Sequence, residues 1–199
     1  MGTHKFFLGA SQKDCIDEVI SHSAELSVWK PFDDRSVRFV GKLAQKLLTH
    51  SDVKKFPEMI AMGHWFRLAK IRELAKAYPS ETDGSISRGR GLVFHLAPAN
   101  VDSIFMYSWL ISLLAGNPNI VRVSQNISPQ FLFLLEVLAA TIEDFGEEIS
   151  GRIVILTYPH ESHISSLLSQ SCFARVVWGG NSTVATVRSI PLRPTAVEM

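Results

Sequence analysis

Cysteine is scarce in this 199-residue sequence, which contains only Cys15 and Cys172. Two cysteines do not make the disulfide framework of a small secreted domain or the ligand pattern of a structural zinc site. Neither sign of charge is in excess, because 20 Lys and Arg nearly balance 19 Asp and Glu and leave a net charge of +1. This balance gives no overall attraction to nucleic acid or to an anionic membrane surface.

Long hydrophobic runs and low-complexity tracts are also missing. The longest nearly uninterrupted apolar stretch, 104–115, falls far short of the roughly 20 residues that a membrane span needs. The apolar segment after Lys5 is too short for the core of a signal peptide. With 46% hydrophobic residues the chain still buries a core, in one large or two small domains. We therefore expect a cytoplasmic protein with no membrane span and no nucleic-acid partner.

The first part of the chain, 1–88, is expected to be an N-terminal helical segment. Apolar residues at helical spacing follow Asp33 and Asp34, either of which suits the first position of a helix. A second helix is expected to begin near Pro57, because proline is tolerated in a first turn, although its apolar residues fit the helical period less cleanly. Residues 78–91 are polar and rich in Ser and Gly, which predicts a loop or a short exposed hairpin.

The second part, 89–199, alternates between two patterns. Helix-like segments separate short apolar runs, and this alternation predicts βαβ units with a parallel sheet. The sequence therefore predicts an α/β protein whose N-terminal helices are followed by an incomplete Rossmann-like parallel sheet, a partial nucleotide-binding domain. The apolar runs are 91–97, 119–124, 152–158 and 174–179, and the helix-like segments are 101–115, 128–144 and 161–170.

Polar motifs follow the predicted strands, where an open α/β sheet binds its ligands. The four motifs are PAN (98–100), SQN (124–126), YPHESH (158–163) and GGNS (179–182). GGNS suits a phosphate best, because its glycines allow close approach to the backbone and Asn181 or Ser182 is expected to cap the next helix. A glycine-rich turn without a ligand explains the same spacing, so both interpretations stay open.

Other residues that resemble sites have simpler explanations. His160 and His163 form an H-x-x-H pair, but no cluster of Cys, Asp or Glu completes a metal site, and no metal is expected. Cys172 precedes a predicted strand without an obvious base beside it, which favours a buried structural thiol over a nucleophile. Asn100 by itself is equally consistent with a helix cap.

The segments GLVFHLAPANVDSIFMYSWLISLLAGNPNIVRVS and VVWGGNSTVATVRSIPL resemble the LuxC-type acyl-CoA reductases of bacterial bioluminescence operons, a family within the aldehyde dehydrogenase superfamily. PFDDRSVRFV and FPEMIAMGHWFRLA resemble the N-terminal region of that family, so the similarity extends over most of the chain from about residue 30 with its motifs in order. The resemblance implies NADPH-dependent reduction of a fatty acyl-CoA or acyl-protein thioester to the aldehyde. It also implies a homo-oligomer when full length and an acyl-protein synthetase as partner.

The resemblance gives a role to the turn at Pro98-Ala99-Asn100, which matches the superfamily's Pro-x-Asn turn beside the cofactor. The amide of Asn100 is expected to donate to the oxyanion of the thiohemiacetal that forms on the catalytic cysteine. A neutral donor suits this role, because it stabilises developing negative charge without losing a proton.

The resemblance also places the cofactor. The superfamily's K-P-[SA]-E motif, which holds the adenine ribose, corresponds to RVSQ, with Arg122, Ser124 and Gln125 at the adenosine end. Its Gly-Ser pyrophosphate turn corresponds to Gly179 and Gly180, which lack the serine hydroxyl. An acidic side chain at residue 125 would repel the 2′-phosphate of NADPH, whereas Gln125 would not, and the planar guanidinium of Arg122 offers two hydrogen bonds to a phosphate. The alternative is that Arg122 only caps the strand end in solvent.

The family's nucleophilic cysteine and its base belong to a domain downstream of the region that matches. We therefore expect the chain to be the N-terminal piece of a reductase, whether by natural truncation, as an engineered fragment or in a split protein, and to be inactive alone. The alternative is a truncated, non-catalytic relative that acts as a binding or interaction protein. The DNA downstream distinguishes the two, because only the enzyme requires a continuation that encodes the cysteine domain.

Overall fold

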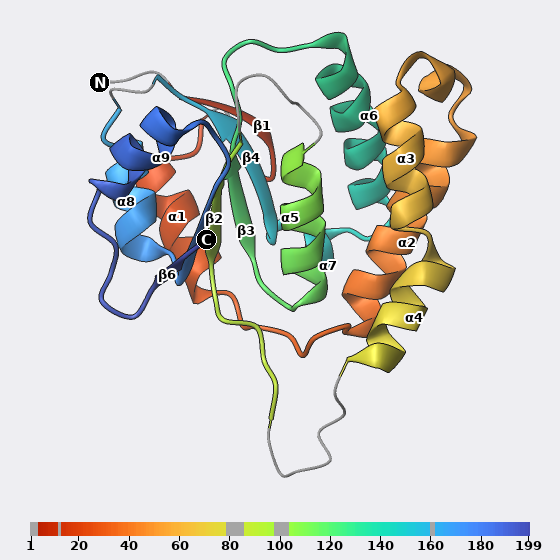
Figure 1. Cartoon of the computed structure of the whole chain (residues 1–199), viewed down its shortest axis with the longest axis horizontal. Coiled ribbons are helices and arrows are strands. Elements are labelled where there is room, and N and C mark those ends of the chain that lie inside the picture. The colour runs from red at the N-terminus through yellow and green to blue at the C-terminus, as the bar shows by residue number, and fades with distance from the viewer. Residues whose placement is uncertain (1–3, 12, 79–85, 98–103, 160–161) are drawn as a thin grey trace.

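The structure is a computed structural model of the chain that describes residues 4–11, 13–78, 86–97, 104–159 and 162–199. A six-stranded sheet lies at its centre in the order β1-β4-β3-β2-β5-β6, with helices on both faces (Figure 1). All neighbouring strands are parallel except β1, which pairs with β4 in the antiparallel direction. The strands are β1 (Lys5–Leu8), β2 (Val93–Leu96), β3 (Asn119–Arg122), β4 (Ile153–Thr157), β5 (Ala174–Val177) and β6 (Val197–Glu198).

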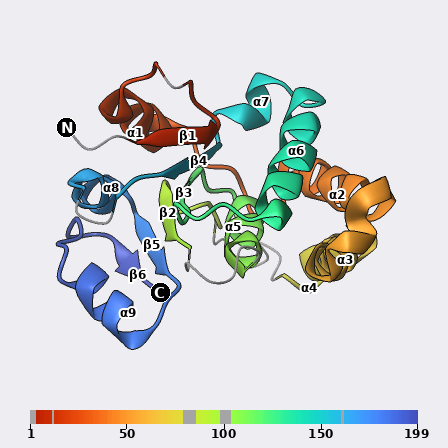
Figure 2. The same cartoon turned by 90° about the horizontal axis from the view of Figure 1, so that it is seen from above.

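The helices divide between the two faces of the sheet (Figure 2). On one face α5 and α6 cover the strands, and α2 packs outside them together with α3 and α4. On the other face lie α1, α8 and α9. The helices are α1 (Ile16–Glu25), α2 (Asp34–Thr49), the 3₁₀ helix η1 (Ser51–Lys55), α3 (Pro57–Trp65), α4 (Leu68–Ala77), α5 (Ile104–Leu114), α6 (Pro129–Glu143), α7 (Glu147–Ser150), α8 (Ile164–Ser171) and α9 (Asn181–Arg188).

Each face of the sheet has its own hydrophobic core. The core under α5 and α6 includes Trp109 and Phe39, both without exposed surface. The core under α1 and α8 includes Phe94 and Leu168, which are equally buried. Because the central strands are covered on both sides, their side chains are buried at every position of β2, β3 and β4.

The predicted α/β class is confirmed, and so are several local predictions. Asp33 caps α2, and its carboxylate accepts a hydrogen bond from the backbone N–H of Arg35 at 3.1 Å. A helix begins at Pro57 as predicted, but it ends at Trp65 and a new helix begins at Leu68. The extended backbone of Arg67, with φ −58° and ψ 145°, interrupts the helix between them, which explains why one helical period did not fit the whole segment.

The segment predicted to be helical, 1–88, also contains a strand that was not predicted, Lys5–Leu8. These residues form β1, whose Phe6 is buried against the sheet beside Leu156 of β4. The strand is only four residues long, and its sequence KFFL does not alternate between apolar and polar residues, so no strand pattern marks it. At its end Gly9 adopts a φ of +78°, where an added Cβ would lie 2.0 Å from the carbonyl oxygen of Ile153.

Candidate functional site

The order of the strands reverses between β2 and β5. From β2 the chain crosses to β3 and β4 on one side, and it then returns to place β5 on the other side of β2. At such a switch point the connections leave the carboxyl ends of the two strands in opposite directions and open a crevice for ligands. Leu96 and Val177 are in register at these ends, so a ligand is expected to bind beyond them.

A glycine turn follows β5 at this point. The backbone N–H of Trp178 still donates to the carbonyl of Leu96 at 3.0 Å, and the exposed Gly179 and Gly180 then lead into α9. Gly180 is the N-cap residue of α9, and no side chain accepts from the first turn. A Cβ added to Gly180 would meet no atom within 4 Å, so the backbone there is open to an anion.

The predicted cap of this helix is wrong. Asn181 and Ser182 were expected to cap α9, but both lie within the helix and Gly180 holds the cap position. An N-cap residue has extended backbone angles, and Gly180 has φ −71° and ψ 166°. Without a side-chain cap, the first N–H groups of α9 stay available to a ligand.

A chain of hydrogen bonds runs from Trp178 into the core beneath α5. The indole Nε1 of Trp178 lies 3.1 Å from Oγ of Ser108, which lies 3.2 Å from Nδ1 of His95. On the other side of the ring, Nε2 of His95 lies 3.0 Å from Oδ1 of Asn119. His95 has no exposed surface, and this burial lowers its pKa to about 4, so the imidazole is neutral at pH 7.

Arg122 lies at the carboxyl end of β3, as predicted, but in a buried setting. Its exposed fraction is 5%, its Nη2 donates to the carbonyl of Tyr158 at 3.3 Å, and its guanidinium lies 5.7 Å from the Tyr158 ring. Burial lowers the pKa of Arg122, and Tyr158 opposes that effect. The alternative in which Arg122 caps the strand end in solvent is therefore wrong.

The other two residues predicted for the adenosine end are more accessible. Ser124 is half-buried, and its Oγ accepts a hydrogen bond from the backbone N–H of Asn126 at 3.1 Å. Among the described residues no acceptor is found for its own hydroxyl hydrogen, and Gln125 beside it is exposed. Both follow β3, the strand next to β2 and therefore next to the switch point. Their contact with a cofactor stays a prediction.

The predicted oxyanion turn cannot be placed. Pro98 and Asn100 lie in the segment 98–103, outside the described residues, and so does His160 of the histidine pair. His163 is exposed just before α8. Among the residues that the structure describes, no group of three or more His, Cys, Asp or Glu side chains could hold a metal ion. The role of Asn100 stays a prediction.

Cys172 is a structural thiol, as predicted. It has no exposed surface, its Sγ donates to the carbonyl of Ser169 at 3.6 Å, and burial raises its pKa to about 11. A buried thiol with a raised pKa is a poor nucleophile. Cys15 is exposed at the start of α1. Over the described ranges, every helix falls short of the length and hydrophobicity that a membrane span requires.

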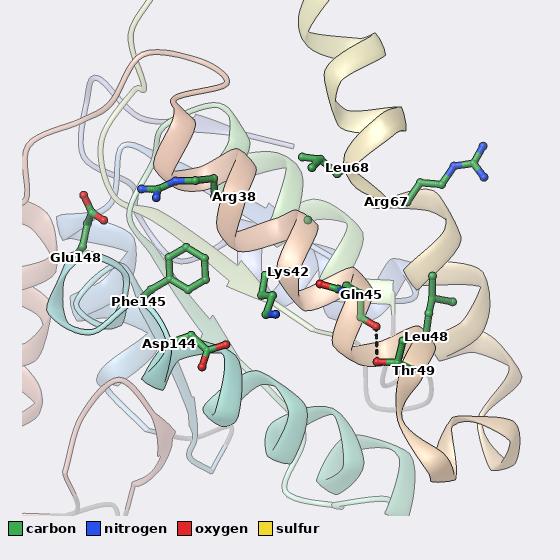
Figure 3. Close-up of a pocket in the computed structure, with 11 residues that line it drawn as sticks. Arg38, Lys42, Gln45, Leu48, Thr49, Arg67, Leu68, Asp144, Phe145 and Glu148 are labelled. Atoms are coloured by element: carbon green, nitrogen blue, oxygen red, sulfur yellow. Dashed lines mark hydrogen bonds between the residues drawn. The ribbon is translucent and has the colours of Figure 1, made fainter.

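A groove lies away from the carboxyl ends of the strands. It has a volume of about 880 Å³ and runs along α2, between α4 and the region that joins α6 to α7 (Figure 3). Arg38 and Lys42 lie on the side of the groove that also holds Asp144 and Glu148, whereas Arg67 points away from these two (Figure 3). Thr49 donates to the carbonyl of Gln45 within the groove at 2.9 Å. This mixed rim favours neither sign of ligand. The charged side chains are Arg38, Lys42, Arg67, Asp144 and Glu148.

The sequence offered one unused signal for the chain that begins at Trp178. His95 is a polar residue in the middle of the apolar run 91–97, and such a residue must find hydrogen-bond partners when it is buried. Its partners Ser108 and Asn119 follow it by 13 and 24 residues on different elements. They could not be identified without the fold.

The fold is shared with several solved aldehyde dehydrogenases of low sequence identity. The chain is similar to a betaine aldehyde dehydrogenase of Staphylococcus aureus (14% identity, TM-score 0.66, 92% of this chain and 41% of that one). It is similar to an NAD-dependent benzaldehyde dehydrogenase of Corynebacterium glutamicum (14%, 0.59, 92% and 44%). It is also similar to a propionaldehyde dehydrogenase of Rhodopseudomonas palustris with bound propionyl-CoA (15%, 0.56, 93% and 45%). The chain thus spans less than half the length of each.

A family model for the acyl-CoA reductases named LuxC matches residues 26–198, which is most of the chain. A comparison with curated proteins gave no match. The matched range includes the whole of β2 to β5 and the glycine turn at Gly179-Gly180. The resemblance seen in the sequence is therefore confirmed, and the chain belongs to the LuxC acyl-CoA reductase family.

Proposed function

We propose that the chain is the cofactor-binding part of an acyl-CoA reductase that uses NADPH to convert a fatty acyl thioester to the aldehyde. The observation that supports it most directly is the open glycine turn at the switch point, within the range that matches the family. The acyl group would come from acyl-CoA or from an acyl-protein thioester. When bound, the cofactor supplies the hydride, and the protein supplies binding and orientation.

The residues at the switch point fit a dinucleotide. Gly180 leaves room for the pyrophosphate beside the uncapped N-terminus of α9, whose N–H groups and helix dipole favour an anion. At Gly179 the absence of a side chain makes room for Thr183, because an added Cβ would lie 3.0 Å from that residue. Ser124 and Gln125 would contact the adenosine end, with Arg122 behind them. Asn100 would donate to the oxyanion of the reacting thioester carbonyl.

Substitution of Gly180 tests the binding site directly. Gly180→Ala places a methyl group in empty space, at a φ of −71° that any residue adopts, so the fold should be unaffected. The methyl group would keep a phosphate from the backbone, and we expect the Kd for NADPH to rise about tenfold, or about 1.4 kcal/mol. Binding is measured by titrating NADPH into the purified 199-residue chain and following its fluorescence.

Gly151 provides a matched control for this substitution. It lies before β4, at the opposite edge of the sheet, and a Cβ there would lie at an ordinary 3.5 Å from Nε2 of His22. Gly151→Ala should therefore bind NADPH as the wild type does. Equal affinity of wild type and Gly180→Ala would show that the pyrophosphate does not lie at this turn.

Gln125→Glu tests the preference for NADPH. The new carboxylate would repel a 2′-phosphate but accept hydrogen bonds from the ribose hydroxyls of NADH. We expect binding of NADPH to weaken much more than binding of NADH when both cofactors are titrated. A wild type that prefers NADH, or equal losses for both cofactors, contradicts this assignment.

Activity tests the reaction itself. The 199-residue chain with NADPH and a long-chain acyl-CoA should yield no aldehyde, because neither Cys172 nor Cys15 is placed as a nucleophile. In a protein that also carries the cysteine domain, Asn100→Ala should lower kcat by about 10²–10³ with little change in KM. Aldehyde from the chain alone, or acylation of Cys172 that Cys172→Ser abolishes, would contradict the first expectation. Near-normal turnover of a poorly folded Asn100→Ala variant would make Asn100 only a helix cap.

A further inference from the structure

The two ends of the hydrogen-bonded series that begins at Trp178 have defined directions. The indole Nε1–H of Trp178 only donates, so Ser108 must accept from it. Oδ1 of Asn119 only accepts, because its Nδ2 donates to the carbonyl of Asn117 at 2.8 Å, so Nε2 of His95 must donate to it. The neutral ring then carries its proton on Nε2 and leaves Nδ1 as an acceptor. The single hydroxyl hydrogen of Ser108 lies within reach of both the carbonyl of Phe105, at 2.9 Å, and Nδ1 of His95, at 3.2 Å.

These hydrogen bonds connect the core of the sheet to the candidate binding turn, Gly179-Gly180. Asn119 and His95 are fully buried on β3 and β2, and Ser108 lies one turn into α5. Trp178 is half-exposed and stands directly before Gly179. The buried end of this hydrogen-bonded series, His95 and Asn119, lies on the paired strands β2 and β3. Its exposed end is Trp178, the residue directly before the glycine turn.

The glycine turn needs such support. Gly179 and Gly180 carry no side chains that could anchor them, and both are exposed. Glycine also has the greatest backbone freedom of any residue, so an unsupported pair would lose entropy when it orders around a ligand. Trp178, the residue before the glycine pair, donates a backbone hydrogen bond to Leu96 and a side-chain hydrogen bond to Ser108.

We propose that Ser108, held between the carbonyl of Phe105 and the ring of His95, is a positioning residue that holds Trp178 and thereby preorganises the Gly179-Gly180 turn for the pyrophosphate of the dinucleotide. This inference rests on the proposed function for its ligand. The link from Ser108 to the turn does not depend on a ligand, because it is the hydrogen bond between Ser108 and Trp178 that the structure already contains. Preorganisation increases affinity because the turn loses less freedom on binding.

Ser108→Ala is the direct test, and Ser112→Ala is its matched control. Ser112 lies one turn further along α5 and is more deeply buried, but among the described residues its hydroxyl has no hydrogen-bond partner. Both variants remove one hydroxyl from the same helix, and only Ser108→Ala frees Trp178. Ser108→Thr keeps a hydroxyl and should restore the wild-type behaviour. Trp178→Phe removes the donor and keeps an aromatic ring.

Two measurements are made on the ¹⁵N-labelled 199-residue chain. Without ligand, hydrogen exchange of the Trp178 indole N–H and the relaxation of the Gly179 and Gly180 amides report on the turn. Ser108→Ala should accelerate the exchange and make both amides more mobile, whereas Ser112→Ala should change neither. With NADPH, Ser108→Ala should raise the Kd about tenfold, and adding Trp178→Phe should cause no further loss, because both remove the same bond.

The outcomes separate this inference from the proposed function. Unchanged amides and unchanged NADPH affinity in Ser108→Ala overturn the inference. Equal effects of Ser108→Ala and Ser112→Ala also overturn it, because they indicate general damage to α5. If the wild type binds no NADPH while Ser108→Ala still loosens the turn, the proposed function fails and the positioning of the turn by Ser108 holds.

Discussion

His95 should make the stability of this protein depend on pH in a defined interval. Its pKa is about 4 in the fold, where the ring is fully buried, and about 6.5 in an unfolded chain. Between these two values the unfolded chain takes up a proton that the folded protein refuses. The contribution of the neutral ring is therefore complete above pH 6.5 and is lost as the pH falls towards 4.

The size of the effect follows from the two pKa values. Each pH unit inside the interval costs about 1.4 kcal/mol, so a change from pH 7 to pH 5 should lower the free energy of unfolding by about 2 kcal/mol through His95 alone. His95→Gln removes the titrating ring and retains an amide that can bond to Asn119. Urea denaturation of both proteins at pH 7 and pH 5 measures the difference, provided that the m-values agree.

The comparison isolates His95 from the carboxylates. Asp33 and Glu198 have lowered pKa values, so their protonation in acid also lowers the free energy of unfolding. This loss occurs equally in the wild type and in the variant. The wild type should lose about 2 kcal/mol more than His95→Gln between the two pH values. Equal losses in the two proteins would show that His95 is protonated in the fold or reached by water, and the assigned direction of its hydrogen bonds would then be wrong.

Three further predictions concern stability and reactivity. Glu198→Gln weakens the ion pair of the buried Arg175, whose Nε lies 2.7 Å from the carboxylate, and should cost about 3 kcal/mol in urea denaturation. Gly116→Ala should lower the Tm, because Gly116 has a φ of +92° and an added Cβ would lie 2.2 Å from the carbonyl oxygen of Trp29; an unchanged Tm would contradict this geometry. An aromatic disulfide reagent should titrate Cys15 at once and Cys172 only after unfolding, so rapid reaction of two thiols in the native protein would be inconsistent with the burial of Cys172.

The four strands β2 to β5 could be predicted because each of them is a local pattern. The run at 152–158 is almost continuously apolar, as a strand covered on both faces should be, and its residues 153–157 form β4 with every residue buried. The start of α2 was equally readable, since the capping of a helix depends on one side chain and the next few N–H groups. These features are set by neighbours in the sequence.

The site was harder to predict because its parts meet only in the fold. The glycine turn was identified from its spacing, but its freedom from a side-chain cap depends on where α9 begins. The burial of Arg122 depends on Tyr158, which lies 36 residues later, directly after β4. The bond between Ser108 and Trp178 joins residues 70 positions apart. Contacts of this kind leave no periodic pattern in the sequence.

The antiparallel strand β1 has a consequence for the order in which the sheet assembles. Lys5 and Thr157 are neighbours in the sheet, yet about 150 residues separate them along the chain. Closing a loop of that length early would cost more free energy, through lost conformational entropy, than the contacts of a four-residue strand can offset. β1 should therefore dock after β4 has paired with β3, and its amides should be the first in the sheet to exchange with solvent when the native protein opens locally.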